Sequence, residues 1–327
     1  MKHANLSIFI PHAGCKHRCT FCNQNRISGQ ISAPSLQEIQ EMIRTCVESP
    51  KHRADSTQIA FFGGSFTCIP RDQMIAYLKL ASEYVESGLF CGIRISTRPD
   101  GIDREILDIL KRYHVTHIEL GAQSMDPSIL LQARRGHTPE DTINAAQMIR
   151  NAGFVLGLQM LIGLPGDSKE TAFRTAKQLA ALQPHEMRLY PISVFPDTVL
   201  YEQYQRGDYQ PLTTMQAVDW IVPIAAYLED RSIRLLRIGL HQADGAVAGA
   251  FHPAFGELVK TGLFNLKLSN LLPPPPADLI IQVSKNMLSI ANGQKRSNLL
   301  YWQQRGYNIK FKAHTSNDIV ITNKIDP

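Results

Sequence analysis

Long hydrophobic runs are missing from this chain of 327 residues. No stretch of about 18 apolar residues occurs, so the sequence predicts no membrane-spanning helix. The first apolar run, residues 6–10, is shorter than the hydrophobic region of a secretory signal. Without such a signal we expect a reducing compartment, where clustered cysteines usually bind metal rather than form disulfides. The sequence therefore predicts a cytoplasmic protein.

Cysteine is missing beyond the first third of the chain. The six cysteines are at positions 15, 19, 22, 46, 68 and 91. Structural zinc modules usually offer two pairs of ligands, and the chain has no second cysteine pair to complete such a module. The three isolated residues, Cys46, Cys68 and Cys91, are interpreted as small buried hydrophobic side chains.

A strong charge of either sign is also missing. The net charge is +5, and charged residues make up 19% of the chain, with no polybasic tail. This mild excess of basic residues is compatible with an anionic partner such as nucleic acid, but many enzymes share it. The length and the 44% of hydrophobic residues indicate a globular protein with one large domain and a small one.

The remaining three cysteines, Cys15, Cys19 and Cys22, stand four and then three positions apart after residues 6–10. This spacing lets three thiolates converge on one centre and leaves one coordination position open. An open position is typical of catalytic metal sites, because structural sites close the coordination shell. The alternative is a structural zinc ion completed by His12 or His17.

Short apolar runs alternate with amphipathic stretches after the cysteines. Strands are predicted at residues 6–10, 58–62, 92–96, 117–120, 154–162 and 187–192. Helices are predicted at residues 35–48, 71–86, 102–113, 139–152 and 168–182. Six such units in succession predict an α/β fold, a partial (β/α)6 barrel with a parallel sheet.

Glycine, hydroxyl and charged residues follow five of the predicted strands. They lie at 63–65, 96–100, 121–124, 163–167 and 188–191. Reactive groups collect at the C-terminal ends of barrel strands, so these positions favour a binding site. Taken singly, each could equally be an ordinary turn, because Gly, Pro and Asp mark turns by themselves.

The pattern changes after about residue 195. Helix is expected through residue 230, with Pro223 as a kink, and residues 232–238 can form one more strand. Residues 239–245 and 252–256 are interpreted as loops. Four prolines at 273–276 predict a stiff connection. Strand, helix, strand and strand are predicted at 278–283, 294–305, 307–312 and 318–322. We therefore expect a core of residues 1–240 and a small C-terminal α+β extension of residues 241–327.

The cysteine spacing, with Phe21 before the third cysteine, resembles the signature of radical S-adenosylmethionine (radical SAM) enzymes. Further motifs occur in order at residues 61–67, 96–100, 119–124, 134–138, 161–165 and 188–191. Together they resemble the radical domain of the catalytic subunit of Elongator, which acts on the wobble uridine of tRNA. The likeness to oxygen-independent coproporphyrinogen oxidase is looser. The resemblance covers residues 6 to about 240.

This resemblance implies a [4Fe–4S] cluster held by Cys15, Cys19 and Cys22, with S-adenosyl-L-methionine on the open iron. It implies cleavage of that cofactor to a 5′-deoxyadenosyl radical, an electron donor such as ferredoxin or flavodoxin, and tRNA as the substrate. Elongator's subunit continues into an acetyltransferase domain. The last ninety residues of the present chain show no pattern of such a domain. Acetyl chemistry would then need a separate acetyl-transfer partner.

The resemblance also implies roles for individual residues. Residues 63–65 would meet the methionyl amino group, Gln123 the ribose or methionyl end, and Arg135 the carboxylate. Met160 and Gly163 would line the adenine, and Ser96 stands where related families often carry glutamate. The full set of expected cofactor contacts is Phe21, Gly63, Gly64, Ser65, Ser96, Gln123, Arg135, Met160, Gly163 and Arg188.

Candidates for catalysis and for substrate binding follow from residue type. Tyr190 and the loop residue His241 are the candidate catalytic residues, and Asp244 and His252 lie in the same region. Basic residues around the expected mouth could contact RNA phosphates or serve the cofactor; they are Lys16, Arg18, Arg26, Arg98, Arg134, Arg135, His137 and Arg188. Two alternatives stay open: a tetrapyrrole or other small-molecule substrate, and a non-catalytic metal-containing RNA-binding module.

Overall fold

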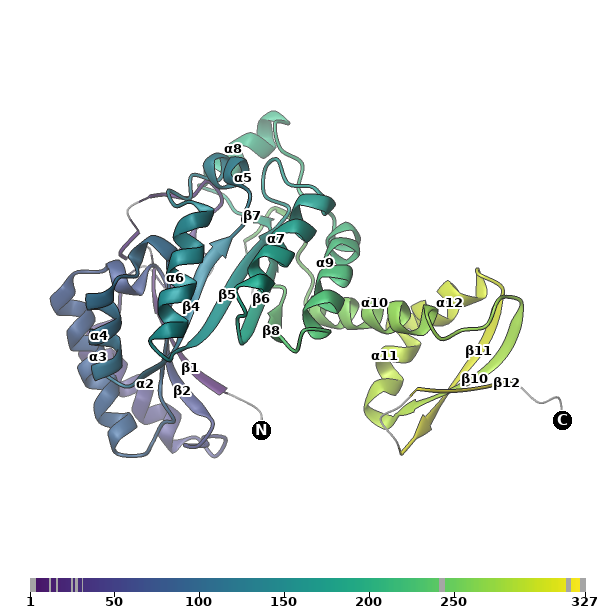
Figure 1. The fold of residues 1–327 in the computed structure, drawn as a ribbon, viewed down its shortest axis with the longest axis horizontal. Coiled ribbons are helices and arrows are strands. Elements are labelled where there is room, and N and C mark those ends of the chain that lie inside the picture. Colours follow the sequence, from purple (N-terminus) through teal and green to yellow (C-terminus); the bar gives the residue numbers. More distant parts are fainter. Residues whose placement is uncertain are drawn as a thin grey trace.

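The computed structural model describes residues 4–323 except 12, 16, 25, 27, 28, 31, 241–244 and 316–318. Two parts of the chain are apparent in Figure 1: a large curled sheet covered by helices, and a smaller unit that projects beyond helix α10. In the part of the chain that is described, no helix combines the length and the apolar character needed to cross a membrane.

The main sheet contains seven strands within the described residues, and every neighbouring pair is parallel. In spatial order they are β1 (Ala4–Ile10), β2 (Thr57–Gly63), β3 (Ile93–Thr97), β4 (Val115–Gln123), β5 (Val155–Ile162), β6 (Glu186–Pro191) and β8 (Arg234–Ile238). The strands β1 and β8 form the two edges, so the barrel is partial. The predicted fold is confirmed, and the seventh strand lies within the expected residues 232–238.

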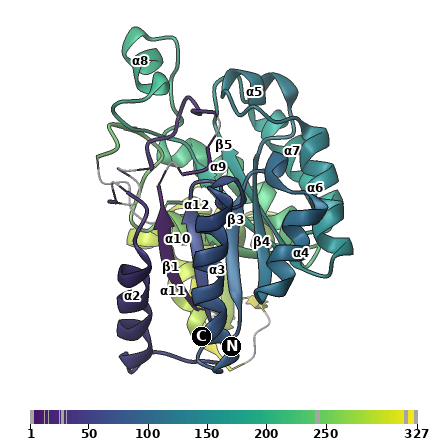
Figure 2. The same ribbon diagram turned by 90° about the vertical axis from the view of Figure 1, so that its left-hand side faces the viewer.

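Helices connect successive strands and lie on one face of the sheet (Figure 2). The six long ones are α2 (Leu36–Glu48), α3 (Arg71–Glu86), α4 (Arg104–Arg112), α6 (Pro139–Asn151), α7 (Lys169–Ala181) and α9 (Thr214–Glu229). Capping boxes fix the starts of four of them, at Ser35, Thr138, Ser168 and Thr213. The helix α9 continues through Pro223.

Side-chain alternation divides the sheet into two faces. Ile93 and Ile95 of β3 and Ile118 of β4 pack among the helices in the main core. Arg94 and Glu119 alternate with them and therefore lie on the opposite, concave face. The interior of the half-barrel is thus polar. Buried charged residues are unusual, so this face is a candidate functional site.

Short elements surround the C-terminal ends of the strands. They are the helices α5 (Pro127–Gln132) and α8 (Val199–Arg206), and the strand pair β7 (Ser193–Val194) and β9 (Ala248–Gly249). A small apolar cluster that includes Ile129, Leu164 and Leu200 joins them. Phe21 packs against this cluster, so it anchors the segment that carries the cysteines.

The smaller unit follows α10 (Phe255–Ser269), a helix that the sequence did not predict; the loop expected at 252–256 ends where this helix begins. Its elements are β10 (Ala277–Ser284), α11 (Leu288–Asn292), α12 (Ser297–Gln303), β11 (Tyr307–His314) and β12 (Val320–Asn323). The strand β10 lies in the middle, parallel to β11 and antiparallel to β12. The expected division of the chain at residue 240 remains a prediction.

The helix α10 belongs to both apolar cores. Val259 and Leu263 pack in the main core, whereas Phe264 and Leu268 pack in the core of the smaller unit. A buried polar chain adds to this connection: Trp302 Nε1 donates to Asn265 Oδ1 at 2.9 Å, and Asn265 Nδ2 donates to Asn298 Oδ1 at 2.7 Å. The smaller unit is therefore attached through packed side chains as well as through the chain itself.

Truncation of Leu268, whose side chain is fully buried, tests the second core. We expect Leu268→Ala to destabilise the smaller unit by about 2–5 kcal/mol, because the cavity cannot fully collapse. Hydrogen exchange should show lost protection in β10 and β11, with β2 to β5 unchanged. The control, Leu266→Ala, removes a side chain that is 39% exposed on the same helix. Equal losses in the two variants, or a loss throughout the main sheet, would contradict the assignment of two cores.

Candidate functional site

The cysteine loop, residues 11–24, leaves β1 and is held against the end of β2. The amide of Gly64 donates to Ile10 O at 2.8 Å, and the amide of Ser65 donates to Ala13 O at 3.0 Å. A Cβ atom at Gly64 would collide with the Ala13 carbonyl, and one at Gly14 (φ +72°) would collide with the Ser65 carbonyl. Glycine is therefore required on both sides of this contact, and Cys15 Sγ comes to 4.0 Å from Ser65 Oγ.

Three further hydrogen bonds hold the loop from the other side. The amide of Thr20 donates to Ala133 O at 3.1 Å, and Thr20 O accepts from the amide of Leu200 at 2.8 Å. Asn23 Nδ2 donates to Pro196 O at 2.9 Å. The loop is therefore fixed by the end of β2 on one side and by α5, α8 and the segment after β7 on the other.

Arg135 lies beneath Cys19. Its Nη1 donates to Cys19 Sγ at 3.2 Å and its Nη2 to Gly121 O at 2.6 Å, and the residue is only 7% exposed. The thiolate is the form of cysteine that binds metal, and the guanidinium holds Cys19 Sγ in a fixed position. The residue predicted to pair with a carboxylate therefore also contacts a cysteine directly.

The three sulfurs affect one another electrostatically. Burial, followed by the charges of Cys19 and Cys15, raises the pKa of the Cys22 thiol to about 12. Three thiolates at this spacing need positive charge nearby, and an iron–sulfur cluster supplies it. The donor set of the loop therefore fits the implied cluster.

A structural zinc ion was the alternative for these cysteines. Within the described residues, no three His, Cys, Asp or Glu side chains are grouped as ligands of one ion. His17, one candidate for a fourth zinc ligand, lies over Gly136, where a Cβ atom would collide with its ring. The other candidate, His12, lies outside the described residues.

Buried polar atoms without a described partner gather at the ends of β3 and β4. They are Arg98 Nη1, Gln123 Oε1 and Arg135 Nε. Leaving such an atom unpaired costs about 1–3 kcal/mol, so a polar ligand at this position would be stabilised. Gln123 has a positive φ of 66° and follows a register irregularity in β4, which redirects its side chain. The arrangement fits a cofactor with carboxylate, amino and hydroxyl groups.

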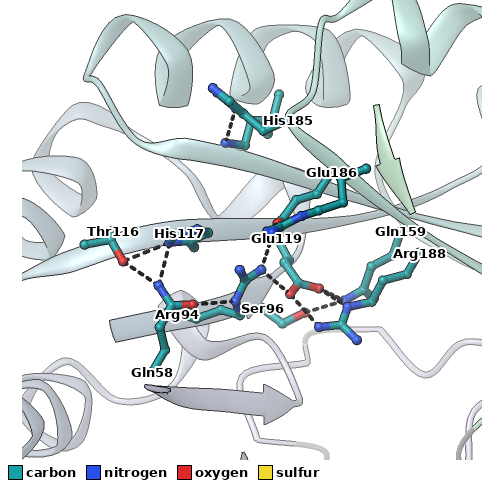
Figure 3. A network of polar contacts seen from close by, with 12 residues as sticks. Gln58, Arg94, Ser96, Thr116, His117, Glu119, Gln159, His185, Glu186 and Arg188 are labelled. Carbon is teal, nitrogen blue, oxygen red and sulfur yellow. Dashed lines mark hydrogen bonds and ion pairs between the residues drawn. The ribbon is translucent and has the colours of Figure 1, made fainter. Parts of the chain in front are cut away.

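A network of buried charges fills the concave face below this position (Figure 3). Arg94, which is 0% exposed, pairs with Glu119 at 2.7 Å and also with Glu186. Its Nε donates to Gln58 Oε1 at 3.0 Å. Glu186 also pairs with Arg234 at 2.5 Å. Strands β2, β3, β4, β6 and β8 are therefore joined by side chains across the interior of the barrel.

Both glutamates of this network are ionised at neutral pH. Burial acts to raise the pKa of Glu119, but the guanidinium groups of Arg188 and Arg94 outweigh it and hold that pKa below its ordinary value. Burial is likewise outweighed at Glu186, where the hydrogen bond and charge of Arg94 lower the pKa. Each carboxylate depends on its arginine partners for this state.

Arg188 connects the network to Tyr190. Its Nε and Nη2 donate to the two oxygens of Glu119 at 2.7 and 3.0 Å, and it also bonds to the Tyr190 side chain. Burial raises the pKa of Tyr190, with Arg188 opposing, so the hydroxyl keeps its proton at neutral pH. Ser96 belongs to the same network, since Gln159 Nε2 donates to both Ser96 Oγ and Glu119 Oε2, at 3.1 and 3.0 Å.

Other predicted site residues lie elsewhere. The side chain of Met160 is 1% exposed and packs in the apolar core, while its main chain lies beside Gln123 in the strand register, so its expected contact stays a prediction. Both main-chain groups of Gly163 are already bonded, the amide to Asp167 Oδ2 at 3.0 Å and the carbonyl to the Tyr209 hydroxyl at 2.6 Å. His241 and Asp244 lie outside the described residues.

The basic residues predicted at the mouth divide into buried and exposed ones, and Arg26 is among the exposed. Burial, followed by the charges of Arg135 and Arg98, lowers the pKa of His137 to about 4, so its inclusion as a basic residue is wrong. Arg98 is 4% exposed and pairs with Asp100 at 2.8 Å. Lys16 is not among the described residues. Arg18 and Arg134 are exposed. The interpretation of Cys91 as buried is also wrong, because it is exposed.

Sequence reasoning missed Arg94 and Glu186. A signal was present, because each interrupts an apolar strand at positions that alternate with core residues: Arg94 between Ile93 and Ile95, and Glu186 before Met187. Alternation predicts that such residues face away from the helices. That they pair with each other follows only from the curvature of the sheet.

Comparisons with known proteins identify the family of the chain. The family described as the Radical SAM superfamily matches residues 9–179, and the Radical_SAM C-terminal domain matches residues 184–264. An uncharacterized protein of Methanocaldococcus jannaschii is 30% identical over 226 residues, which are 66% of this chain and 69% of that protein.

A second relative and a solved structure are more informative. The tRNA uridine(34) acetyltransferase of Methanocaldococcus jannaschii is 31% identical over 169 residues, 50% of this chain and only 31% of that protein. The structure of archaeal Methanocaldococcus infernus Elp3 aligns with a TM-score of 0.67 at 21% identity, covering 84% of this chain and 65% of that chain. The predicted resemblance to the radical domain of the Elongator catalytic subunit is confirmed.

Removal of Arg94 tests the charge network. We expect Arg94→Met to lower the free energy of unfolding by about 3–5 kcal/mol at pH 7, because it leaves Glu119 and Glu186 buried with one cation fewer. Urea unfolding from pH 7 to pH 2 measures this. Both glutamates have lowered pKa values in the folded protein, so their stabilisation is present above about pH 4.3 and is lost as the pH falls through the folded values. The difference between variant and parent should therefore shrink at low pH.

The matched control is Arg44→Met, which removes an arginine from an exposed pair with Glu41. Its effect should be far smaller, because solvent screens exposed pairs. A loss at Arg94 that is independent of pH, or no larger than at Arg44, would contradict the proposed electrostatic role.

Proposed function

This chain belongs to the radical SAM superfamily, and from that premise we propose that it is an enzyme that modifies a base of tRNA. It would hold a [4Fe–4S] cluster through Cys15, Cys19 and Cys22 and bind S-adenosyl-L-methionine beside it. The observation that carries the proposal is the position of these cysteines, which are pinned next to strand ends with unpaired buried polar atoms.

The chain's own residues would bind and orient the cofactor. When bound, the cluster supplies the electron that cleaves S-adenosyl-L-methionine to methionine and a 5′-deoxyadenosyl radical. Arg135 has its Nε free to donate to a carboxylate, and Gln123 has its Oε1 free to accept from an amino or hydroxyl group. The other expected contacts, at Phe21, residues 63–65, Ser96 and Arg188, remain predictions.

Tyr190 is the residue that we propose to meet the substrate. Its hydroxyl is protonated and is held by Arg188, which is itself fixed by two hydrogen bonds to Glu119. A donor whose position is fixed in this way can orient a substrate group without reorganising. His241, the other candidate, stays a prediction.

Support for tRNA comes from the relatives. One is named as a tRNA uridine(34) acetyltransferase, and the solved structure is of an Elp3 protein. The chain spans about a third of the acetyltransferase, so the acetyl step of that protein is not carried over. A separate acetyl-transfer partner and an electron donor such as ferredoxin or flavodoxin belong to this proposal.

Anaerobic reconstitution with iron and sulfide tests the cofactor chemistry. We expect brown protein that releases 5′-deoxyadenosine and methionine when S-adenosyl-L-methionine and a reductant are added. Cys19→Ala should lose both colour and products, because a cluster with two thiolate ligands is not retained. Cys91→Ala, at an exposed cysteine outside the loop, should behave as the parent. Colourless protein with one bound zinc ion would contradict the proposal and would support a structural metal module.

Substitution of adjacent arginines tests the cofactor contact. Arg135→Lys should weaken binding of S-adenosyl-L-methionine to the reconstituted protein by roughly 10- to 100-fold, since lysine cannot reproduce a planar fork of donors. Arg134→Lys changes the exposed neighbour and should alter the affinity by less than about twofold. Equilibrium dialysis with labelled cofactor measures both, and equal affinities for the two variants would rule out the contact.

A further inference from the structure

The smaller unit carries nearly all of the chain's excess positive charge. Residues 270–327 contain seven Lys or Arg, three Asp and no Glu, so four of the five net charges lie there. Both family matches end by residue 264, so neither covers this unit. A segment of this length without glutamate is poor in the carboxylates that would neutralise its lysines.

Helices cover only one face of the three-stranded sheet. Leu279, Ile281 and Ile309 face those helices in the second core, and Phe311 packs against Phe264 with ring centroids 5.7 Å apart. The alternate residues therefore face outward. We call this outward surface the open face; it comprises Asp278, Ile280, Gln282, Ser284, Asn308, Lys310, Lys312, His314, Val320 and Thr322.

The strand register orders the open face into rows. Lys310 lies beside Ile280, and Lys312 lies beside Gln282, which has Val320 on its other side. Both lysines are exposed, and neither forms an ion pair within the described residues. Among the residues of this face that the structure describes, the single acid is Asp278, which lies beside Asn308 at the start of the strands. Two free cations thus stand two residues apart on one strand, next to neutral partners.

We propose that the open face is a docking surface for the backbone of a structured RNA. Charge complementarity carries the choice of partner, since lysines without carboxylate partners bind phosphates and release counterions. The proposal deepens the function proposed above and rests on it, because it assigns to this face the tRNA that the barrel would modify.

The open face also indicates how the RNA would be read. Among its described residues there is no Phe, Tyr or Trp ring on which a base could stack, and the one imidazole, His314, stands at the end of β11; Tyr307 and Phe311 belong to the opposite face. The lysines can meet phosphates, and the hydroxyl and amide groups of Ser284, Gln282 and Thr322 can meet sugars or phosphates. Recognition would therefore depend on RNA shape rather than on base sequence.

The arrangement of the two units agrees with a large substrate. The smaller unit projects beyond α9 and β8, away from α3 and α4 (Figure 1), and α10 attaches it through both cores. At the mouth of the barrel, Arg98, Arg135 and Arg188 are already bonded to protein groups. Arg18 and Arg134 are exposed there and can add to an RNA contact. Exposed cations on a firmly attached unit can bind a part of the RNA that lies outside the barrel.

Lysines on edge strands also prevent strands of other chains from adding to a sheet. That role accounts for lysine on β11, which is an edge strand. It does not account for the absence of glutamate from the whole unit. If the lysines only protect the edge of the sheet, their replacement leaves RNA binding unchanged. If they dock RNA, their replacement weakens it.

The test compares tRNA binding by the full-length parent and Lys310→Glu/Lys312→Glu at several salt concentrations. The variant should bind about tenfold or more weakly at low salt, and its slope of log affinity against log salt should fall by roughly 2. The control, Lys79→Glu/Lys111→Glu, makes the same change in charge at exposed positions on α3 and α4 and should retain the parent's affinity. The double variant Lys310→Ala/Lys312→Ala removes the two charges without reversing them, so it should weaken tRNA binding by less. It controls for a loss of binding caused by disturbance of the strand.

Equal affinity of the parent and the Lys310/Lys312 variant would overturn the docking surface, as would an equal fall in the control. Binding of the parent to phosphatidylserine vesicles, lost in the variant while tRNA binding is retained, would assign the face to membranes instead. Two unrelated RNA duplexes of the same length should bind equally. Nucleoside analysis of tRNA treated with the parent protein tests the proposed function separately. If the variant loses tRNA binding but the parent leaves tRNA unmodified, the docking surface is supported and the proposed function is refuted.

Discussion

The interior of the half-barrel is built around buried charges that must neutralise one another. Arg94 pairs with Glu119 and Glu186, and Glu119 in turn holds Arg188, so one network joins five of the seven strands. Replacing it with apolar residues would be possible for stability alone. Its retention places a fixed arginine and a protonated tyrosine at the concave face, directly below the strand ends that hold the cysteine loop.

Local patterns predicted most of the main sheet. The strands and helices predicted through residue 191 lie within about three residues of their observed ends, because apolar alternation and capping residues are local signals; the short helix α5 was missed. The helix α10 was missed because its N-cap, Ala254, offers no side-chain hydrogen bond and follows His252-Pro253 directly. The helix predicted at 294–305 corresponds to α12, and α11 was missed; left-handed Lys295 and Arg296 separate the two.

The site was only partly readable from the sequence. The cysteine spacing and strand-end glycines were visible, and the structure explains them by the contacts of Gly14 and Gly64 with opposing carbonyls. The predicted basic mouth was not, because sequence cannot distinguish an arginine that faces solvent from one that is buried. Arg98 and Arg135 are buried, whereas Arg18 and Arg134 are exposed, and further exposed cations lie on the smaller unit. The radical chemistry and the proposed RNA contact are therefore assigned to different parts of the chain.

The central claim is that the radical chemistry of this chain is directed at tRNA. Mass analysis of tRNA nucleosides from a strain that lacks the gene tests it most directly. The account predicts that one modified nucleoside disappears, returns when the parent gene is restored, and stays absent when the restored gene carries Cys19→Ala. Identical nucleosides in the two strains would contradict the claim and would leave a small-molecule substrate for the same radical chemistry.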